Sequence, residues 1–162
     1  MDSKWAKVWC KDGFPKINVF FWIFFHRKSL TAENLRKRGI EGTTYCILYK
    51  EFEETLEHLF LECKFTQKVW YHSLHSLQFT LILPTNWNDM FDCWKDYYQG
   101  SLHQKTDLTR TWVALPNYIC WKIWTAKNKE IFDGEASRPE SIKSCKVIVG
   151  GGSIIVRDDQ HR

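Results

Sequence analysis

The chain has 162 residues, of which 44% are hydrophobic and 16% are aromatic, including nine Trp and eleven Phe. This composition suits a packed core and excludes a largely disordered protein. The formal net charge is only +4, but residues 1–40 carry nine basic and three acidic side chains, whereas residues 41–63 carry one basic and six acidic. Contact with nucleic acid is therefore expected at one end only.

The sequence gives no indication of secretion or membrane insertion. The N-terminus has no charged segment followed by a long apolar run, and the most apolar stretch, residues 19–25, is shorter than the roughly 20 residues that span a bilayer. The six cysteines are irregularly spaced and include no Cys-x-x-Cys pair. We therefore expect reduced thiols in an intracellular protein, nuclear or cytoplasmic, that is not secreted and contacts no membrane.

The first forty residues predict two helices. Pro15 is suited to a first helical position, and apolar residues follow at helical spacing: Ile17, Phe20, Phe21 and Phe24. Other residues of this segment are apolar too, which predicts a helix buried on most sides: Val19, Trp22, Ile23 and Phe25. A second helix, residues 32–38, is expected between an N-cap at Thr31 and a terminating Gly39.

Three further helices are expected in the middle of the chain. The first follows Thr55 as N-cap and ends before Cys63, the second covers residues 65–77, and the third follows Asn86 as N-cap. Their inward faces should carry these residues: Leu56, Leu59 and Phe60; Val69, Trp70, Leu74 and Leu77; Trp87, Met90, Phe91 and Trp94.

The last part of the chain changes from a helical to a strand pattern. A long helix is expected over residues 106–132, kinked or divided at Pro116 and ending at Gly134. Its inward residues are spaced by three and four: Leu108, Trp112, Leu115, Ile119 and Ile123. Residues 147–149 and 153–156 then predict two strands around a glycine-rich turn.

Three residues between positions 46 and 63 have the chemistry and spacing of a metal site. Cys46, His58 and Cys63 stand in the pattern Cys-x2-Tyr-x8-His-x4-Cys, and zinc takes thiolate and imidazole ligands. Residues five apart on an α-helix lie about 140° apart around its axis. We therefore expect the helix to end between His58 and Cys63, with His58 on its last turn. Each residue alone would more often be structural, so the inference depends on their joint spacing.

The same region resembles the reverse transcriptase zinc-binding domain of plant LINE-type retroelements. The resemblance covers residues 5–75 and, less closely, 112–134, and it includes the metal-site pattern and three flanking segments: Phe14-Pro15-Lys16-Ile17, Asn34-Leu35-Arg36-Lys37-Arg38-Gly39-Ile40 and Trp121-Lys122-Ile123-Trp124. It implies a zinc site with a second cysteine where this chain has Tyr49. A phenol is a poor zinc ligand beside a thiolate, so we expect zinc binding to be weakened or lost.

The tail resembles the start of a plant retroelement ribonuclease H. Residues 150–160 are similar to the second strand of that domain, and Asp158 and Asp159 match its turn. The resemblance places a catalytic Asp on the preceding strand, where this chain has Val147-Ile148-Val149. Two-metal cleavage needs clustered carboxylates, so we expect no nuclease activity.

These observations predict a mainly α-helical protein with three regions. They are a zinc-binding-like helical domain (5–80), a helical linker region (81–134) and a truncated ribonuclease H-like remnant (135–162). The leading hypothesis is a non-catalytic module with no small-molecule substrate that contacts RNA or DNA through one cationic flank: Lys16, Arg27, Lys28, Arg36, Lys37 and Arg38.

Three alternatives remain open. The chain is an inactive fragment of a reverse transcriptase/ribonuclease H polyprotein, or it has no retained function. A third possibility is a hydrolytic zinc site at the open ligand position, which would need a general base from the nearby acids: Glu51, Glu53, Glu54 and Glu57. The aromatic residues are expected to form the core, with stacking on nucleic-acid bases as the alternative.

Overall fold

The computed structural model describes residues 15–75, 80, 82–101, 106–142, 146–150 and 153–157. It is mainly helical, as predicted. The helices, including one π-helical turn (η1) and one 3-10 turn (η2), and the two strands are, in chain order, α2 (Pro15–Phe25), α3 (Ala32–Lys37), η1 (His58–Glu62), α4 (Lys64–His75), α5 (Trp87–Ser101), α6 (Thr106–Asp133), η2 (Pro139–Ser141), β1 (Lys146–Gly150) and β2 (Ser153–Arg157).

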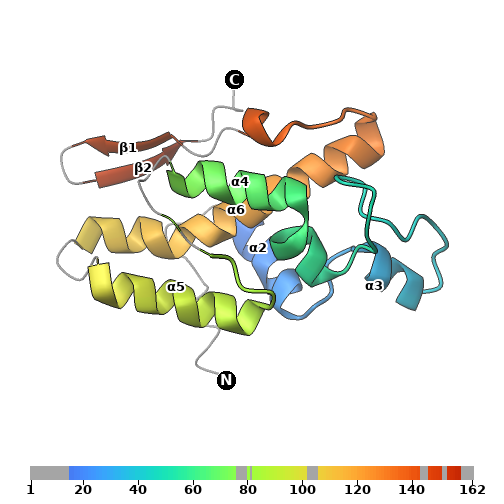
Figure 1. Ribbon diagram of the computed structural model, residues 1–162, viewed down its shortest axis with the longest axis horizontal. Coiled ribbons are helices and arrows are strands. Elements are labelled where there is room, and N and C mark those ends of the chain that lie inside the picture. Colours follow the sequence, from blue (N-terminus) through green and yellow to red (C-terminus); the bar gives the residue numbers. More distant parts are fainter. Residues whose placement is uncertain are drawn as a thin grey trace.

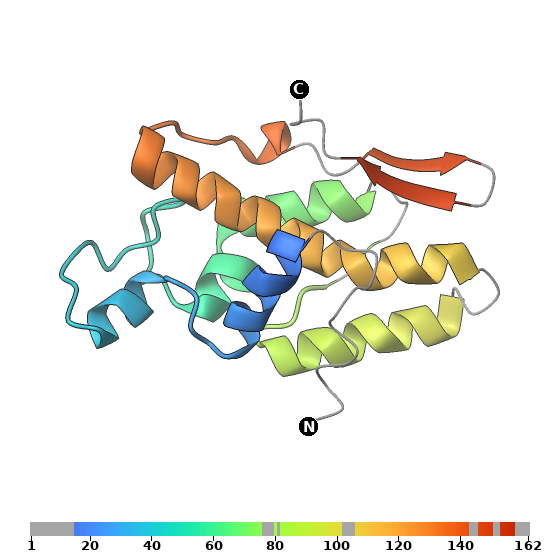
Figure 2. The ribbon, with the colours of Figure 1, turned by 180° about the vertical axis from the view of Figure 1, so that it is seen from behind.

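Helix α6 is the central element of the arrangement. It runs across the molecule in Figures 1 and 2 and contacts α2, α4 and β2. Strands β1 and β2 pair antiparallel, with Lys146 opposite Arg157 and Gly150 opposite Ser153. These strands cover the segments in which strands were expected, whereas Asp158 and Asp159 lie outside the described residues. Among the described residues, no helix is long and apolar enough to cross a bilayer.

The three predicted N-caps are confirmed by their hydrogen bonds. Thr31 Oγ1 accepts a hydrogen bond from the Asn34 N–H, Thr55 Oγ1 accepts one from the His58 N–H, and Asn86 Oδ1 accepts one from the Asp89 N–H. Gly39 and Gly134 follow helices with φ of 73° and 68°, a left-handed conformation that costs glycine little.

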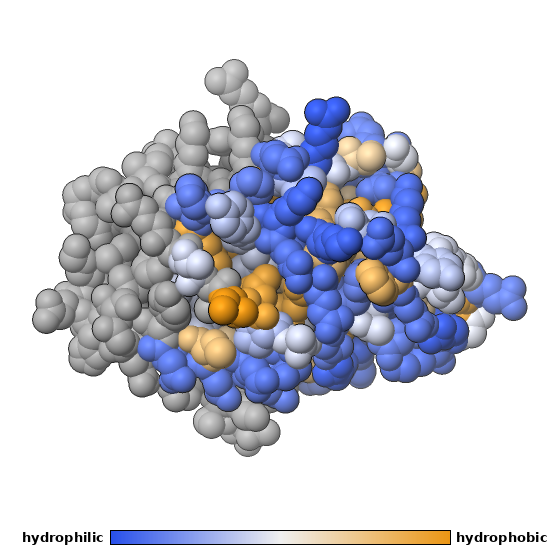
Figure 3. All heavy atoms as spheres, in the orientation of Figure 1, coloured by the Kyte–Doolittle hydropathy of each residue, from blue (hydrophilic) through white to orange (hydrophobic). Residues whose placement is uncertain are grey.

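Aromatic side chains from four separate segments form the core. The Phe24 ring of α2 lies 4.6 Å from the Trp87 ring of α5 and 5.0 Å from the Phe60 ring of η1, measured between centroids. The Trp124 ring of α6 stacks on Phe60 at 6.5 Å. On the face drawn in Figure 3, polar side chains predominate among the coloured residues, and apolar ones gather in a few separate places. These aromatic residues therefore serve packing, as expected.

One prediction for α2 is wrong. The helix buries a single face formed by Ile17, Phe20, Phe21 and Phe24, whereas Val19 is 53% exposed and Trp22 is 51% exposed. At 100° per residue, Val19 and Trp22 lie on the side opposite the buried face, and no described element covers them. The helix is therefore amphipathic in its packing although its sequence is apolar all round.

Pro116 bends α6 without dividing it. The helix is continuous from Thr106 to Asp133 and changes direction along its length (Figures 1 and 2). Proline has no N–H for the carbonyl four residues earlier, which belongs to Trp112. That carbonyl accepts a hydrogen bond of 2.8 Å from the indole N–H of Trp94 on α5, and the two indole rings stack 4.2 Å apart. The α5–α6 contact thus replaces the bond that proline removes.

Candidate metal centre

Cys46, His58 and Cys63 converge on one buried point from two pieces of backbone. Cys46 lies in the loop after α3, where its N–H bonds to the Phe52 carbonyl and the neighbouring residues Tyr45 and Glu53 form an isolated β-bridge. His58 begins the η1 turn, and Cys63 follows its last residue. All three side chains are buried, and one potential ligand atom of each lies within 4.8 Å of the others.

The turn between His58 and Cys63 differs from the expectation of a helix that ends between them. The backbone stays helical through Glu62 but widens to a π-helical turn, in which the Cys63 N–H donates to the His58 carbonyl at 2.8 Å. In this geometry residues five apart lie about one turn apart, so their side chains face the same side. On an α-helix His58 and Cys63 would lie about 140° apart around the axis. The π-helical turn instead directs both side chains to the same side.

The distance between the two sulfurs fits a shared metal ion. Two thiolates held at about 2.3 Å by one tetrahedral Zn²⁺ would lie about 3.8 Å apart. The Sγ atoms of Cys46 and Cys63 are 3.8 Å apart, and both cysteines are free thiols. The spacing thus matches two ligands of one zinc ion.

The surroundings of the sulfurs favour a thiolate. The hydrogen bond with Cys46, together with bonds from His58 and the N–H groups of Thr66 and Phe65, lowers the pKa of Cys63 to about 4, although burial raises it. The same pairing and burial raise the pKa of Cys46 far above its ordinary value, although the N–H groups of Leu48 and Tyr49 lower it. The proximity of the two sulfurs thus opposes ionisation of both, and a cation between them would allow both to ionise.

His58 completes a donor set that fits zinc. Its side chain is buried, and its Nε2 atom has no hydrogen-bond partner. An unsatisfied buried ring nitrogen costs free energy unless something binds it. Because one ring nitrogen of His58 lies within 4.8 Å of both sulfurs, the imidazole would supply the third ligand of a set of two thiolates and one imidazole, which zinc accepts.

Tyr49 lies at the edge of this cluster. Its backbone N–H faces the Cys46 sulfur, so position 49 belongs to the turn that wraps the metal site. Its ring lies 5.0 Å from the Lys64 ammonium, and a hydrogen bond with its hydroxyl, together with the charge of Glu51, raises the pKa of Lys64. A cysteine at position 49 would therefore have its backbone N–H already facing the Cys46 sulfur.

The four acids near the site are all engaged with basic side chains. Glu57 pairs with Arg27, and the other three pairs have N–O distances between 2.5 and 3.6 Å: Glu53 with Arg36, Glu54 with Lys127 and Glu51 with Lys64. Each carboxylate is therefore occupied by a basic side chain and is not directed at the metal site as a general base would be.

The six predicted nucleic-acid-binding cations have different environments. Three of them pair with acids: Arg27 with Glu57, Arg36 with Glu53 and Lys37 with Glu33. Lys16 lies 5.8 Å from the centroid of the Trp121 ring. Arg38 donates to the Lys28 carbonyl, and in the described part of the chain no acidic side chain pairs with either Lys28 or Arg38. These two remain the most available for phosphate.

The ion pair between Glu54 and Lys127 was not expected from the sequence. The Lys127 ammonium lies 2.6 Å from Glu54 Oε1, and the two side chains are 2% (Glu54) and 3% (Lys127) exposed. Lys127 also donates to the Leu30 carbonyl, and Glu54 Oε1 accepts from the Ala32 N–H, both at 2.8 Å. The pair joins residues 73 positions apart, so no local pattern could reveal it.

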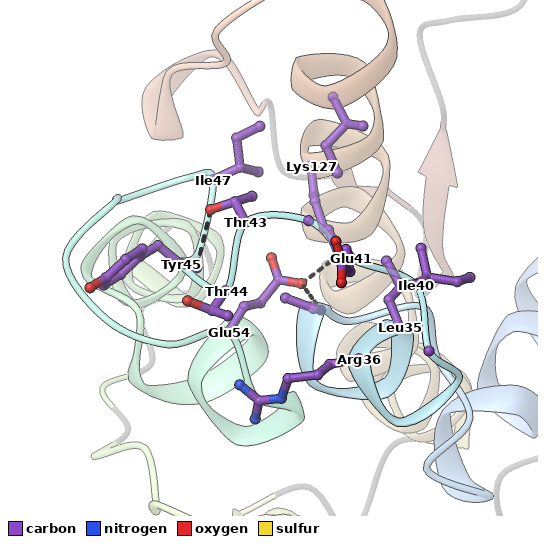
Figure 4. A pocket seen from close by; sticks show the side chains of 14 residues that line it. Leu35, Arg36, Ile40, Glu41, Thr43, Thr44, Tyr45, Ile47, Glu54 and Lys127 are labelled. Carbon is purple, nitrogen blue, oxygen red and sulfur yellow. Dashed lines mark hydrogen bonds and ion pairs between the residues drawn. The ribbon is translucent and has the colours of Figure 1, made fainter.

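This pair lies beside a pocket of about 810 Å³ between α3, the loop before Cys46 and α6 (Figure 4). Figure 4 shows the Glu54 carboxylate pointing toward Lys127 and the backbone of α3. Because Glu54, Lys127 and the Arg36 on its rim are all in ion pairs, these charged groups serve the fold.

Comparison with known proteins supports a metal-binding role for the first part of the chain. No curated protein and no solved structure matched in these comparisons. A protein-family model matches residues 1–70, and this range contains Cys46, Tyr49, His58 and Cys63. The family whose model matches this range is described as zinc-binding in reverse transcriptase.

Proposed function

We propose that this chain is a non-catalytic zinc-binding module derived from a LINE-type retroelement polyprotein. It holds Zn²⁺ through Cys46, His58 and Cys63, and the second cysteine of the ancestral site has been replaced by Tyr49. The observation that carries the proposal is the convergence of the three buried donor groups within 4.8 Å of one another. The family match over residues 1–70 supports the identity of the metal.

The role of zinc in this proposal is structural. The ion would join the loop that carries Cys46 to the turn that carries His58 and Cys63, and metal bound only by the folded state stabilises it. A hydrolytic role is disfavoured because the four nearby acids are engaged in ion pairs, with Glu54 buried. Water would complete the coordination in place of the lost cysteine.

Contact with RNA or DNA is the second part of the proposal. Glu53 and Glu57, from the segment between Cys46 and Cys63, pair with Arg36 of α3 and with Arg27 after α2. The metal site thereby supports the backbone that presents the cationic flank. Exposed ion pairs contribute little free energy, so phosphate can compete for their cations.

Thermal unfolding of the full chain with Zn²⁺ and with a chelator tests the metal site. Free zinc at 100 times its Kd should add about 2.7 kcal/mol to the free energy of unfolding and raise the Tm. Cys63→Ser should abolish most of this rise, whereas Cys93→Ser, which removes an exposed thiol on α5, should keep it. No zinc-dependent rise in the wild type, or an equal rise in Cys63→Ser, would reject the proposal.

A further inference from the structure

The exposed side of α2 carries an aromatic pair that the core does not use. Trp22 is 51% exposed, and the centroid of its ring lies 4.4 Å from that of His26, one turn later. Nδ1 of His26 also lies 2.8 Å from the Trp22 carbonyl oxygen, which fixes the imidazole against the helix end. A large flat ring thus stands open to solvent in a defined orientation.

Two cations that pair with no acidic side chain in the described part of the chain follow this pair, Lys28 in the loop after α2 and Arg38 at the end of α3. The Lys28 N–H bonds to the Ile23 carbonyl, which holds the backbone of Lys28 against the last turn of α2, the helix that carries Trp22. The Arg38 guanidinium donates to the Lys28 carbonyl at 3.2 Å, so the side chain at the end of α3 lies against the loop that follows α2. Figure 2 shows the end of α2 leading through this loop into α3.

The loop between α2 and α3, which contains Lys28, is held in place by several hydrogen bonds. The Asn34 amide donates to the carbonyls of Arg27 and Ser29, each at 2.8 Å. Arg27 has a φ of 53°, which few residues other than glycine adopt, and its guanidinium pairs with Glu57. The loop backbone that carries Lys28, and the Arg38 guanidinium bonded to it, are therefore held in place before any ligand binds.

We propose that this surface binds single-stranded nucleic acid, with one base stacked on Trp22 and the adjoining phosphates held by Lys28 and Arg38. The inference rests on the nucleic-acid contact proposed above and adds the form of the ligand. Base stacking on an exposed aromatic ring needs an unpaired base, because the bases of a duplex already stack on one another. The positive charges of Lys28 and Arg38 favour a polyanion as the ligand. An apolar protein partner would leave both cations without a counter-charge.

Fluorescence anisotropy with a labelled 12-nucleotide single strand and the matching duplex tests this inference. The wild-type chain should prefer the single strand, and Trp22→Ala should weaken that binding about fivefold or more. Trp22→Phe keeps an aromatic face and should retain most of the affinity. Phe132→Ala removes an aromatic ring that is 79% exposed at the end of α6 and should have no effect.

The salt dependence measures the contribution of the cations. Lys28→Ser combined with Arg38→Ser should reduce the slope of log affinity against log salt by about 1.4 for a single strand. Equal binding of both strand forms with no effect of Trp22→Ala would overturn the base platform and leave the electrostatic contact standing. No binding of either form at low salt would overturn the platform and the nucleic-acid contact together, without touching the zinc proposal.

Discussion

At the scale of residues, the spacing of Cys46, His58 and Cys63 was enough to predict a shared site but not its geometry. Side-chain chemistry and a local pattern are visible in a sequence, whereas the π-helical turn that aligns His58 with Cys63 is not. The N–H groups of Leu48 and Tyr49 that face the Cys46 sulfur also depend on loop conformation. In the function proposed above, Tyr49 is the clearest residue-level difference from a four-ligand zinc site.

Tyr49→Cys should restore a fourth ligand. We expect zinc affinity to rise roughly tenfold or more, because losing even an indirect supporting contact of a metal site usually costs 10- to 100-fold. The Tm in excess zinc should rise as well. Native mass spectrometry during zinc titration measures the affinity, and Tyr71→Cys on the exposed face of α4 controls for an added thiol. Unchanged zinc affinity in Tyr49→Cys would show that position 49 does not face the metal.

At the scale of elements, the helices and their caps were predictable because each depends on neighbours in sequence. The exposure of Val19 and Trp22 on α2 was not, since an all-apolar helix does not show which of its faces will find a partner. The consequence of Pro116 was predictable only in part. A bend follows from proline itself, but the indole of Trp94 that bonds to the Trp112 carbonyl comes from another helix.

A double-mutant cycle between Trp94 and Pro116 tests this compensation. Trp94→Phe removes the donor to the Trp112 carbonyl and should lower the free energy of unfolding by about 1–3 kcal/mol. In a Pro116→Ala background, the new N–H can bond to that carbonyl, so the same change should cost less. Urea unfolding of the four proteins gives the coupling. Strictly additive effects would mean that the indole does not replace the missing helix bond.

At the scale of the whole molecule, basic side chains of the first forty residues form ion pairs with acidic side chains of the segment that follows. The basic first forty residues and the acidic segment after them suggested a nucleic-acid surface, yet Arg27 and Arg36 pair with acids of that segment. Glu54 instead reaches Lys127 on α6 and links the loop after α3 to the end of the long helix. Such pairing depends on the assembled backbone, so net charge alone could not predict it.

Lys127→Met should therefore destabilise the whole molecule. It leaves the buried Glu54 carboxylate without its cation, which should lower the free energy of unfolding by roughly 3–5 kcal/mol. Adding Glu54→Gln should recover part of the loss. Lys129→Met breaks an exposed pair with Glu135 and should change the free energy of unfolding far less, because solvent screens exposed ion pairs. Chemical denaturation compares the variants, and equal effects of the two lysine substitutions would contradict a structural role for the buried pair.

The most direct test of the zinc site is an X-ray absorption spectrum of the zinc-loaded full chain at the zinc edge. We expect a four-coordinate ion with two sulfur neighbours at about 2.3 Å, one imidazole nitrogen and one further light atom. Cys46→Ser should reduce the sulfur count to one. A first shell of oxygen and nitrogen alone, or one that Cys46→Ser leaves unchanged, would show that Cys46, His58 and Cys63 do not hold the metal together.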